Sequence, residues 1–193
     1  DPIEYVYTPK KAIINQREVG VDVEDYEHGL YASLREDPDV ILIGEMRTPE
    51  TIETALVAAE TGHLVFSTIH TNSAVDSIDR IVGVFPENKQ PQIRLQLSMT
   101  LKAVLAQQLV PRATGRGRAA ACELMMITPP VRNLIRDGKT PQMQSYLMSG
   151  GKDGSVTMDR FLAELAGKGV IMPETAMEAA DDPEEMRKNF MFR

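Results

Sequence analysis

Short apolar runs alternate with helical patterns between residues 40 and 83. Val40-Ile41-Leu42-Ile43 is an uninterrupted apolar run, which is typical of a parallel strand buried on both faces. Residues 48–62 carry the apolar period of a helix, with a threonine, a proline and a glycine where helices start and end. A second buried strand is expected over 63–70 and a helix over 74–82. Strand, helix, strand and helix with short connections predict a doubly wound α/β layer.

The chain before this layer is less regular. Residues 12–16 predict a short strand. Residues 25–35 predict a helix that begins at Asp25, and Pro38 prevents its continuation.

The pattern changes after residue 86. Leucine and isoleucine recur at steps of four over residues 90–106, which predicts a helix there. Two apolar segments, 107–112 and 118–127, flank a Gly-containing turn and predict a hairpin.

Only helical patterns follow residue 127. We expect helices over 130–137, 158–165, 173–180 and 183–193. The sequence therefore predicts an α/β part over residues 1–127 and a helical C-terminal region over residues 128–193.

Composition narrows the class of protein. The chain has 193 residues, a formal net charge of −7 and one cysteine, Cys122. One cysteine excludes an intrachain disulfide and a multi-cysteine zinc site within this sequence, and the acidic balance argues against binding nucleic acid or membranes through bulk charge. No apolar run reaches the roughly 18 residues of a membrane span, and no signal peptide is visible.

The strongest candidate for chemistry is Glu45, which follows the apolar run and Gly44. The carboxyl end of a parallel strand is where α/β folds bind ligands, and a carboxylate there can orient water or support a metal-bound phosphate. An acid after a strand is also common as a structural feature, and both interpretations stay open. Glu4 is a second candidate, with a solvated terminal acid as the alternative.

Histidine and arginine supply the other candidates. His63 and His70 stand at opposite ends of the second expected strand, so they cannot form one metal site, and His70 is better placed for a phosphate. Arg132 and Arg136 are four residues apart on an expected helix, where an ordinary surface helix is the alternative. The sequence contains neither G-x-x-x-x-G-K-[S/T] nor G-x-G-x-x-G.

Four segments, in order, resemble the type IV pilus retraction ATPases, the PilT-like twitching-motility branch of the type II/IV secretion ATPase superfamily. Asp1-Pro2-Ile3-Glu4 resembles the end of the family's Asp box, and residues 34–47 resemble its Walker B region. Residues 59–71 resemble its His box. Residues 131–136 resemble the retraction signature AIRNLIRE, with Pro130 in place of the leading Ala and Asp137 in place of the final Glu.

The resemblance implies a RecA-like P-loop ATPase core, a parallel sheet with flanking helices, followed by a helical region. It implies ATP and Mg²⁺ as cofactors, with Glu4 as the catalytic base and Glu45 supporting Mg²⁺ through water. His70 would sense the γ-phosphate, Arg17 and Arg35 would neutralise charge, and His63 would lie near a subunit boundary. A further set, Arg132, Asn133, Leu134, Ile135 and Arg136, would act in motor output.

The resemblance also implies a homohexamer in the cytoplasm, at the inner-membrane face of a pilus base. It would associate with the membrane peripherally, through partners that include a platform protein, and would bind no nucleic acid. The four-cysteine zinc insert of assembly and type II secretion relatives is ruled out for this segment, so no zinc is expected. In this family the Walker A loop precedes the Asp box, so the chain is expected to begin inside a domain and to be inactive by itself.

Three alternatives stay open beside the retraction motor. The chain could belong to a non-catalytic ring or regulatory subunit of the same machinery, to an accessory retraction ATPase, or to a secretion or pilus assembly ATPase.

Overall fold

The computed structural model describes residues 2–149 and 153–191. The chain divides into two compact units, residues 1–69 and residues 70–193. Asp1, the first residue of the Asp-box resemblance, lies outside the described residues. Within the described part, no helix is both long and apolar enough to cross a bilayer.

A parallel strand pair forms the centre of the first unit. The strands β1 (Val40–Ile43) and β2 (Leu64–Ser67) pair from Val40↔Leu64 to Ile43↔Ser67. Helix α2 (Pro49–Glu60) connects them, and α1 (Tyr26–Ser33) packs beside α2. The predicted caps are confirmed, because the side chains of Asp25 and Thr48 accept backbone hydrogen bonds at the two helix starts.

The expectation that β1 is buried on both faces is wrong. Ile41 and Ile43 are buried against Leu30 of α1 and against alanines of α2, whereas Val40 and Leu42 on the other face are 53% and 65% exposed. The described helices α1 and α2 cover only one face, and the apolar run therefore has an exposed side.

The predicted strand over residues 12–16 is also wrong. Among the described residues this segment has no ladder partner, and Ile13 is 91% exposed. An apolar run without a neighbouring strand leaves its backbone groups unpaired, so β-propensity alone does not make a strand.

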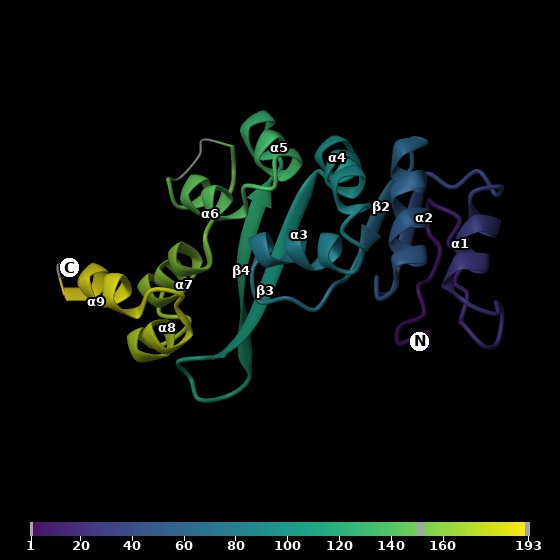
Figure 1. Cartoon of the computed structure of the whole chain (residues 1–193). Helices are drawn as coiled ribbons and strands as arrows, with labels where there is room; N and C mark the ends of the chain where they lie inside the picture. The colour runs from purple at the N-terminus through teal and green to yellow at the C-terminus, as the bar shows by residue number, and fades with distance from the viewer. Residues whose placement is uncertain (1, 150–152, 192–193) are drawn as a thin grey trace. The chain divides into compact units, whose positions relative to one another are not determined.

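A long antiparallel hairpin forms the centre of the second unit (Figure 1). Its strands are β3 (Ala103–Pro111) and β4 (Arg118–Met126), and Gly115 and Gly117 in the turn adopt φ of +70° and +73°, where glycine is favoured. The hairpin confirms the prediction. Helices α3 (Ala74–Gly83) and α4 (Gln90–Thr100) precede it.

The predicted helix over residues 90–106 is too long. Helix α4 ends at Thr100, and Leu105 lies in β3 with 62% of its surface exposed. Steps of four residues also match the period of two in a strand, so Leu101 and Leu105 extended the helical pattern falsely.

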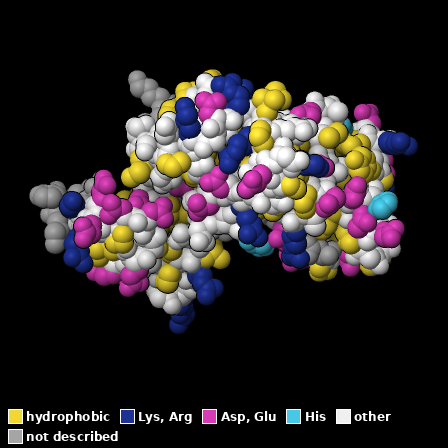
Figure 2. All heavy atoms as spheres, in the orientation of Figure 1, with side chains coloured by type: hydrophobic (Ala, Val, Ile, Leu, Met, Phe, Trp, Pro, Cys, Tyr) yellow, Lys and Arg dark blue, Asp and Glu magenta, His cyan; other side chains and the backbone are white. Residues whose placement is uncertain are grey.

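Within residues 2–149 and 153–191, five helices follow the hairpin, and acidic side chains gather over the last of them (Figure 2). They are α5 (Pro129–Arg136), α6 (Thr140–Met148), α7 (Met158–Gly167), α8 (Pro173–Ala179) and α9 (Pro183–Met191). Helix α6 was not expected, although Met143 and Leu147 are four residues apart and both are buried. The last two residues of the helix predicted over 183–193 lie outside the described residues. The domain boundary expected between residues 127 and 128 stays a prediction.

Candidate functional site

Glu45 lies two residues beyond the end of β1, as the sequence predicts. Its carboxylate accepts from Nε and Nη2 of Arg47, each at 2.6 Å, and its side chain is only 13% exposed. Arg47 is largely exposed, and the hydrogen bond to Glu45 raises the pKa of its guanidinium. The structure therefore places a carboxylate, paired with an arginine, at the carboxyl end of the parallel pair.

Thr68, the residue after β2, is hydrogen-bonded to the segment that follows β1. Its hydroxyl donates to the Gly44 carbonyl at 2.5 Å, and the Met46 amide donates to the Thr68 carbonyl at 3.1 Å. Glu45 thus stands between two residues that are both bonded to Thr68. Sequence reasoning missed this residue, whose place in the His-box resemblance was the available signal.

Glu4 is exposed and lies in an extended segment that other side chains hold. The Ile3 amide donates to Glu18 Oε2 at 3.1 Å, and the Tyr7 amide donates to Gln16 Oε1 at 2.8 Å. The backbone on either side of Glu4 is therefore anchored. The resemblance implies that Glu4 and Glu45 act at one nucleotide, so the two acids should lie close together, and this stays a prediction.

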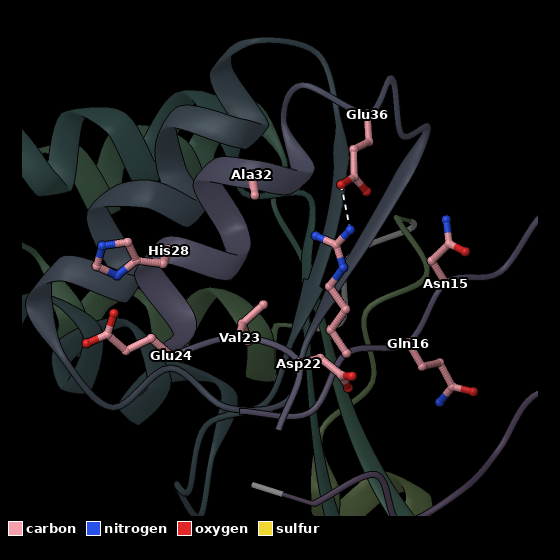
Figure 3. Close-up of a pocket in the computed structure, with 9 residues that line it drawn as sticks. Asn15, Gln16, Asp22, Val23, Glu24, His28, Ala32 and Glu36 are labelled. Carbon is pink, nitrogen blue, oxygen red and sulfur yellow. Dashed lines mark hydrogen bonds and ion pairs between the residues drawn. The ribbon is translucent and has the colours of Figure 1, made fainter. Parts of the chain in front are cut away.

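Arg17 is engaged by a carboxylate. Its Nη2 lies 2.6 Å from Glu36 Oε1, and the two side chains are 39% and 40% exposed. The pair borders a groove of about 1060 Å³ between residues 15–17, residues 22–24 and α1, shown in Figure 3 with a dashed line at Glu36. The sequence did not single out Glu36, although it adjoins Arg35.

The charges that line this groove do not suit a triphosphate. Its lining includes the carboxylates of Asp22, Glu24 and Glu36 but only one guanidinium, that of Arg17. Arg35 is exposed in the turn after α1 and is not part of this lining. A phosphate at Arg17 would share the guanidinium with Glu36 or replace it.

His63 stabilises the turn between α2 and β2. Its Nδ1 lies 2.9 Å from the Ala58 carbonyl and 3.2 Å from Thr61 Oγ1. A carbonyl only accepts, so the contact with Ala58 requires a proton on Nδ1 and leaves Nε2 as the acceptor of the neutral ring. His70 is exposed and begins the second unit.

The five residues of the predicted output segment lie on α5 and divide by burial. Ile135 is fully buried and Leu134 is partly buried, whereas the others face a groove of about 400 Å³ between α4 and α5. Arg132 and Arg136 share this groove, as their spacing predicts. Arg132 Nε is buried and makes no hydrogen bond within the described part of the chain.

Metal ligands do not gather in the described part of the chain. No three His, Cys, Asp or Glu side chains there could hold a metal ion together. A dedicated protein cage for a metal is therefore absent from residues 2–149 and 153–191.

Comparisons with known proteins agree on one family. The family model described as "Type II/IV secretion system protein" matches residues 1–146. The chain is 50% identical over 184 residues to the "Type IV pilus retractation ATPase PilT" of Pseudomonas aeruginosa, covering 95% of this chain and 53% of that protein. It is 49% identical over 186 residues to a "Twitching motility protein" of Neisseria gonorrhoeae, covering 96% of this chain and 50% of that protein.

A solved structure gives the same result for the fold. The crystal structure of "the Pilus Retraction Motor PilT and Bound ADP" matches with a TM-score of 0.87 and 50% identity, over 97% of this chain and 53% of that one. The predicted α/β ATPase fold class is thereby confirmed. The chain spans about half the length of the curated relatives it matches.

Proposed function

Because the chain belongs to the type II/IV secretion system protein family, we propose that it is part of a hexameric motor that couples ATP hydrolysis to retraction of a type IV pilus. The observation that carries this proposal is Glu45, an almost buried carboxylate at the carboxyl end of the β1–β2 pair. This is the edge where open α/β sheets bind nucleotides. The similarity to retraction ATPases supports the direction of the motor.

In this motor Glu4 is the base that activates the attacking water. His70 contacts the γ-phosphate, and Arg17 and Arg35 neutralise the charge that develops during transfer. Such charge stabilisation is the main contribution that a protein makes to phosphoryl transfer. His63 lies near the boundary between neighbouring subunits.

Glu45 supports Mg²⁺ through water. Mg²⁺ usually keeps several waters and takes one or two carboxylates together with substrate phosphates, so a single carboxylate without a protein cage suits it. The bound ion would neutralise phosphate charge. Arg47 holds the Glu45 carboxylate in place through Oε2.

The motor works in the cytoplasm at the inner-membrane face of the pilus base. The homohexamer binds a platform protein there, and Arg132, Asn133 and Arg136 on α5 act in the transfer of motion to that partner. Leu134 and Ile135 hold α5 on its neighbours, so that the groove moves with the ATPase part.

A non-catalytic ring subunit is the second candidate. It is favoured if the full product of the gene, like residues 1–193, contains no G-x-x-x-x-G-K-[S/T] motif, because phosphates are normally held by the amides and lysine of such a loop. Residues 1–193 by themselves are therefore expected to hydrolyse no ATP. Steady hydrolysis by the full product of the gene that encodes this chain supports the motor, and its absence supports the ring subunit.

The Glu4→Gln variant of the full gene product tests the motor directly. We expect ATP affinity to be preserved and turnover to fall by about 10²-fold or more, because general-base catalysis contributes about 10²–10⁴-fold. Glu87→Gln, which also removes an exposed acid, is the matched control and should retain turnover. Equal loss of affinity and turnover in Glu4→Gln would point to a structural role for Glu4.

A further inference from the structure

Glu123 is a buried carboxylate in the middle of β4. Along this strand Ala119, Ala121, Glu123 and Met125 share the buried face, and Glu123 is only 1% exposed. Burying a carboxylate costs free energy unless hydrogen bonds compensate.

The two oxygens of Glu123 bind the starts of two different helices. Oε1 accepts from the Ala74 amide at 2.8 Å, and Oε2 accepts from the Met158 amide at 3.4 Å. Ala74 and Met158 are the first residues of α3 and α7, where unpaired amides and the helix dipole favour an anion. One side chain therefore connects both helices to the hairpin, which both of them contact (Figure 1).

The charges around Glu123 are acidic. Burial raises the pKa of its carboxyl group, the two backbone donors oppose that rise, and the charges of Asp181 and Asp159 add to it. Asp159 lies in α7 and itself accepts from the amides of Asp181 and Asp182 at 2.7 and 3.0 Å. Glu123 is therefore held by backbone amides and not by a basic partner among these neighbours.

The segment before α3 depends on the same helix start. The Thr71 and Ser77 hydroxyls are 2.7 Å apart, and Ser77 Oγ also donates to the Ser73 carbonyl at 3.0 Å. Ser73 caps α3 by accepting from the Asp76 amide. Residues 71–73 are thus bonded to the first turns of α3, and the anchor of those turns is Glu123.

We propose that Glu123 is a positioning residue that fixes the segment carrying His70 and links it to the first turn of α7. The link rests on the proposed function for the nucleotide contact of His70. A nucleotide that displaces this segment strains the bond between the Ala74 amide and Glu123, and the same carboxylate carries that strain to the Met158 amide at the start of α7. Glu123 thereby couples the nucleotide segment to the C-terminal helices.

Amide hydrogen exchange of the full gene product tests the geometry. Glu123→Ala should raise exchange at residues 73–76 and 157–160 by about tenfold or more, the scale expected for losing a hydrogen bond to a charged acceptor. Glu123→Gln keeps one acceptor oxygen and should raise exchange at only one helix start. Asp159→Asn is the control and should leave residues 73–76 unchanged. Unchanged exchange at both helix starts in Glu123→Ala overturns the proposal. If that variant does not fold, unchanged exchange at both helix starts in Glu123→Gln overturns it instead.

The ratio of ATP to ADP affinity tests the functional part, because a merely structural loss would not change it. His70→Ala should lower this ratio, and Glu123→Ala should lower it by about two- to thirtyfold, the range of couplings through residues outside a ligand site. The double variant should match His70→Ala alone. If His70→Ala lowers the ratio and Glu123→Ala does not, the link to nucleotide is overturned while the proposed function stands. If His70→Ala has no effect, the nucleotide role of His70 fails, and the exchange data still judge the link between helices.

Discussion

The Arg17 guanidinium and the Glu36 carboxylate form a 2.6 Å ion pair, about 40% exposed on each side, at the edge of an acidic groove. The arginine for which we propose a phosphate contact is thus paired with a carboxylate in this structure. The Glu36 carboxylate and a phosphate compete for the Arg17 guanidinium, because a guanidinium binds both groups in the same planar geometry.

Glu36→Gln should therefore strengthen nucleotide binding through Arg17. An exposed ion pair contributes about 0.2–1 kcal/mol, which corresponds to an increase in ATP affinity of up to about fivefold. Titration with a fluorescent ATP analogue measures it in the full gene product.

Two control variants distinguish the effect of the Arg17–Glu36 ion pair from a general effect of negative charge in the groove. Glu24→Gln removes an acid from the same groove without touching Arg17 and should change affinity less than Glu36→Gln. In an Arg17→Ala background Glu36→Gln should have no further effect. An equal gain in that background would show that Glu36 acts by bulk charge alone.

The start of α1 should depend on pH through Asp25 and His28. His28 Nδ1 lies 2.9 Å from the Asp25 carboxylate, which also accepts from the His28 amide at 2.8 Å. The amide hydrogen bond lowers the pKa of Asp25 below 3.8, and the side-chain hydrogen bond raises the pKa of His28 above 6.5.

The direction of the pH effect on stability follows from the difference in pKa between the folded and unfolded states. The Asp25 contribution is complete above pH 3.8 and is lost as the pH falls through its lowered pKa. The His28 contribution is complete below pH 6.5 and is lost as the pH rises through its raised pKa. Helix α1 should thus be best protected between these two values. Asp25→Asn keeps an acceptor for the cap, and NMR titration should show the pKa of His28 falling toward 6.5. An unchanged histidine titration would mean that the pair is absent in solution.

Thr68→Val should loosen the carboxyl end of the β1–β2 pair. The variant keeps the shape of the side chain and removes the hydroxyl that donates to Gly44. Loss of one such hydrogen bond should lower the free energy of unfolding by about 0.5–1.5 kcal/mol, and turnover should fall because Glu45 is less firmly placed. Ser67→Ala is the control, because Ser67 Oγ makes only a 3.5 Å contact with the neighbouring carbonyl. Full turnover in Thr68→Val would show that Glu45 needs no such support.

The sequence predicts local elements better than the contacts between them. Asp25 and Thr48 mark helix starts correctly because capping involves residues only three apart. The exposed face of β1 and the missing strand at residues 12–16 depend on which neighbours cover them, which no local pattern contains.

The candidate site shows the same division. Glu45 was found because its position after an apolar run is visible in the chain, whereas Glu36 and Thr68 act through partners 19 and 24 residues away. The sequence also contains a signal for Glu123, although the interpretation of the sequence did not single it out. It falls on the same alternation as Ala119, Ala121 and Met125, and a carboxylate at a buried position requires specific partners.

Arg132→Ala should separate motion from hydrolysis. Arg132 and Arg136 line the α4–α5 groove, whereas Ile135 on the same helix is fully buried. If the groove transfers motion to a partner, Arg132→Ala should retain most of the ATP turnover and abolish pilus retraction, because Arg132 is only partly buried and its Nε makes no hydrogen bond in the described part of the chain. Ile135→Ala should instead destabilise the protein by about 2–5 kcal/mol through the cavity that it leaves, and lower turnover and retraction together. Pilus retraction measured on cells, together with ATP turnover of the purified full gene product, distinguishes the two variants. Loss of hydrolysis in Arg132→Ala would place Arg132 in the catalytic step.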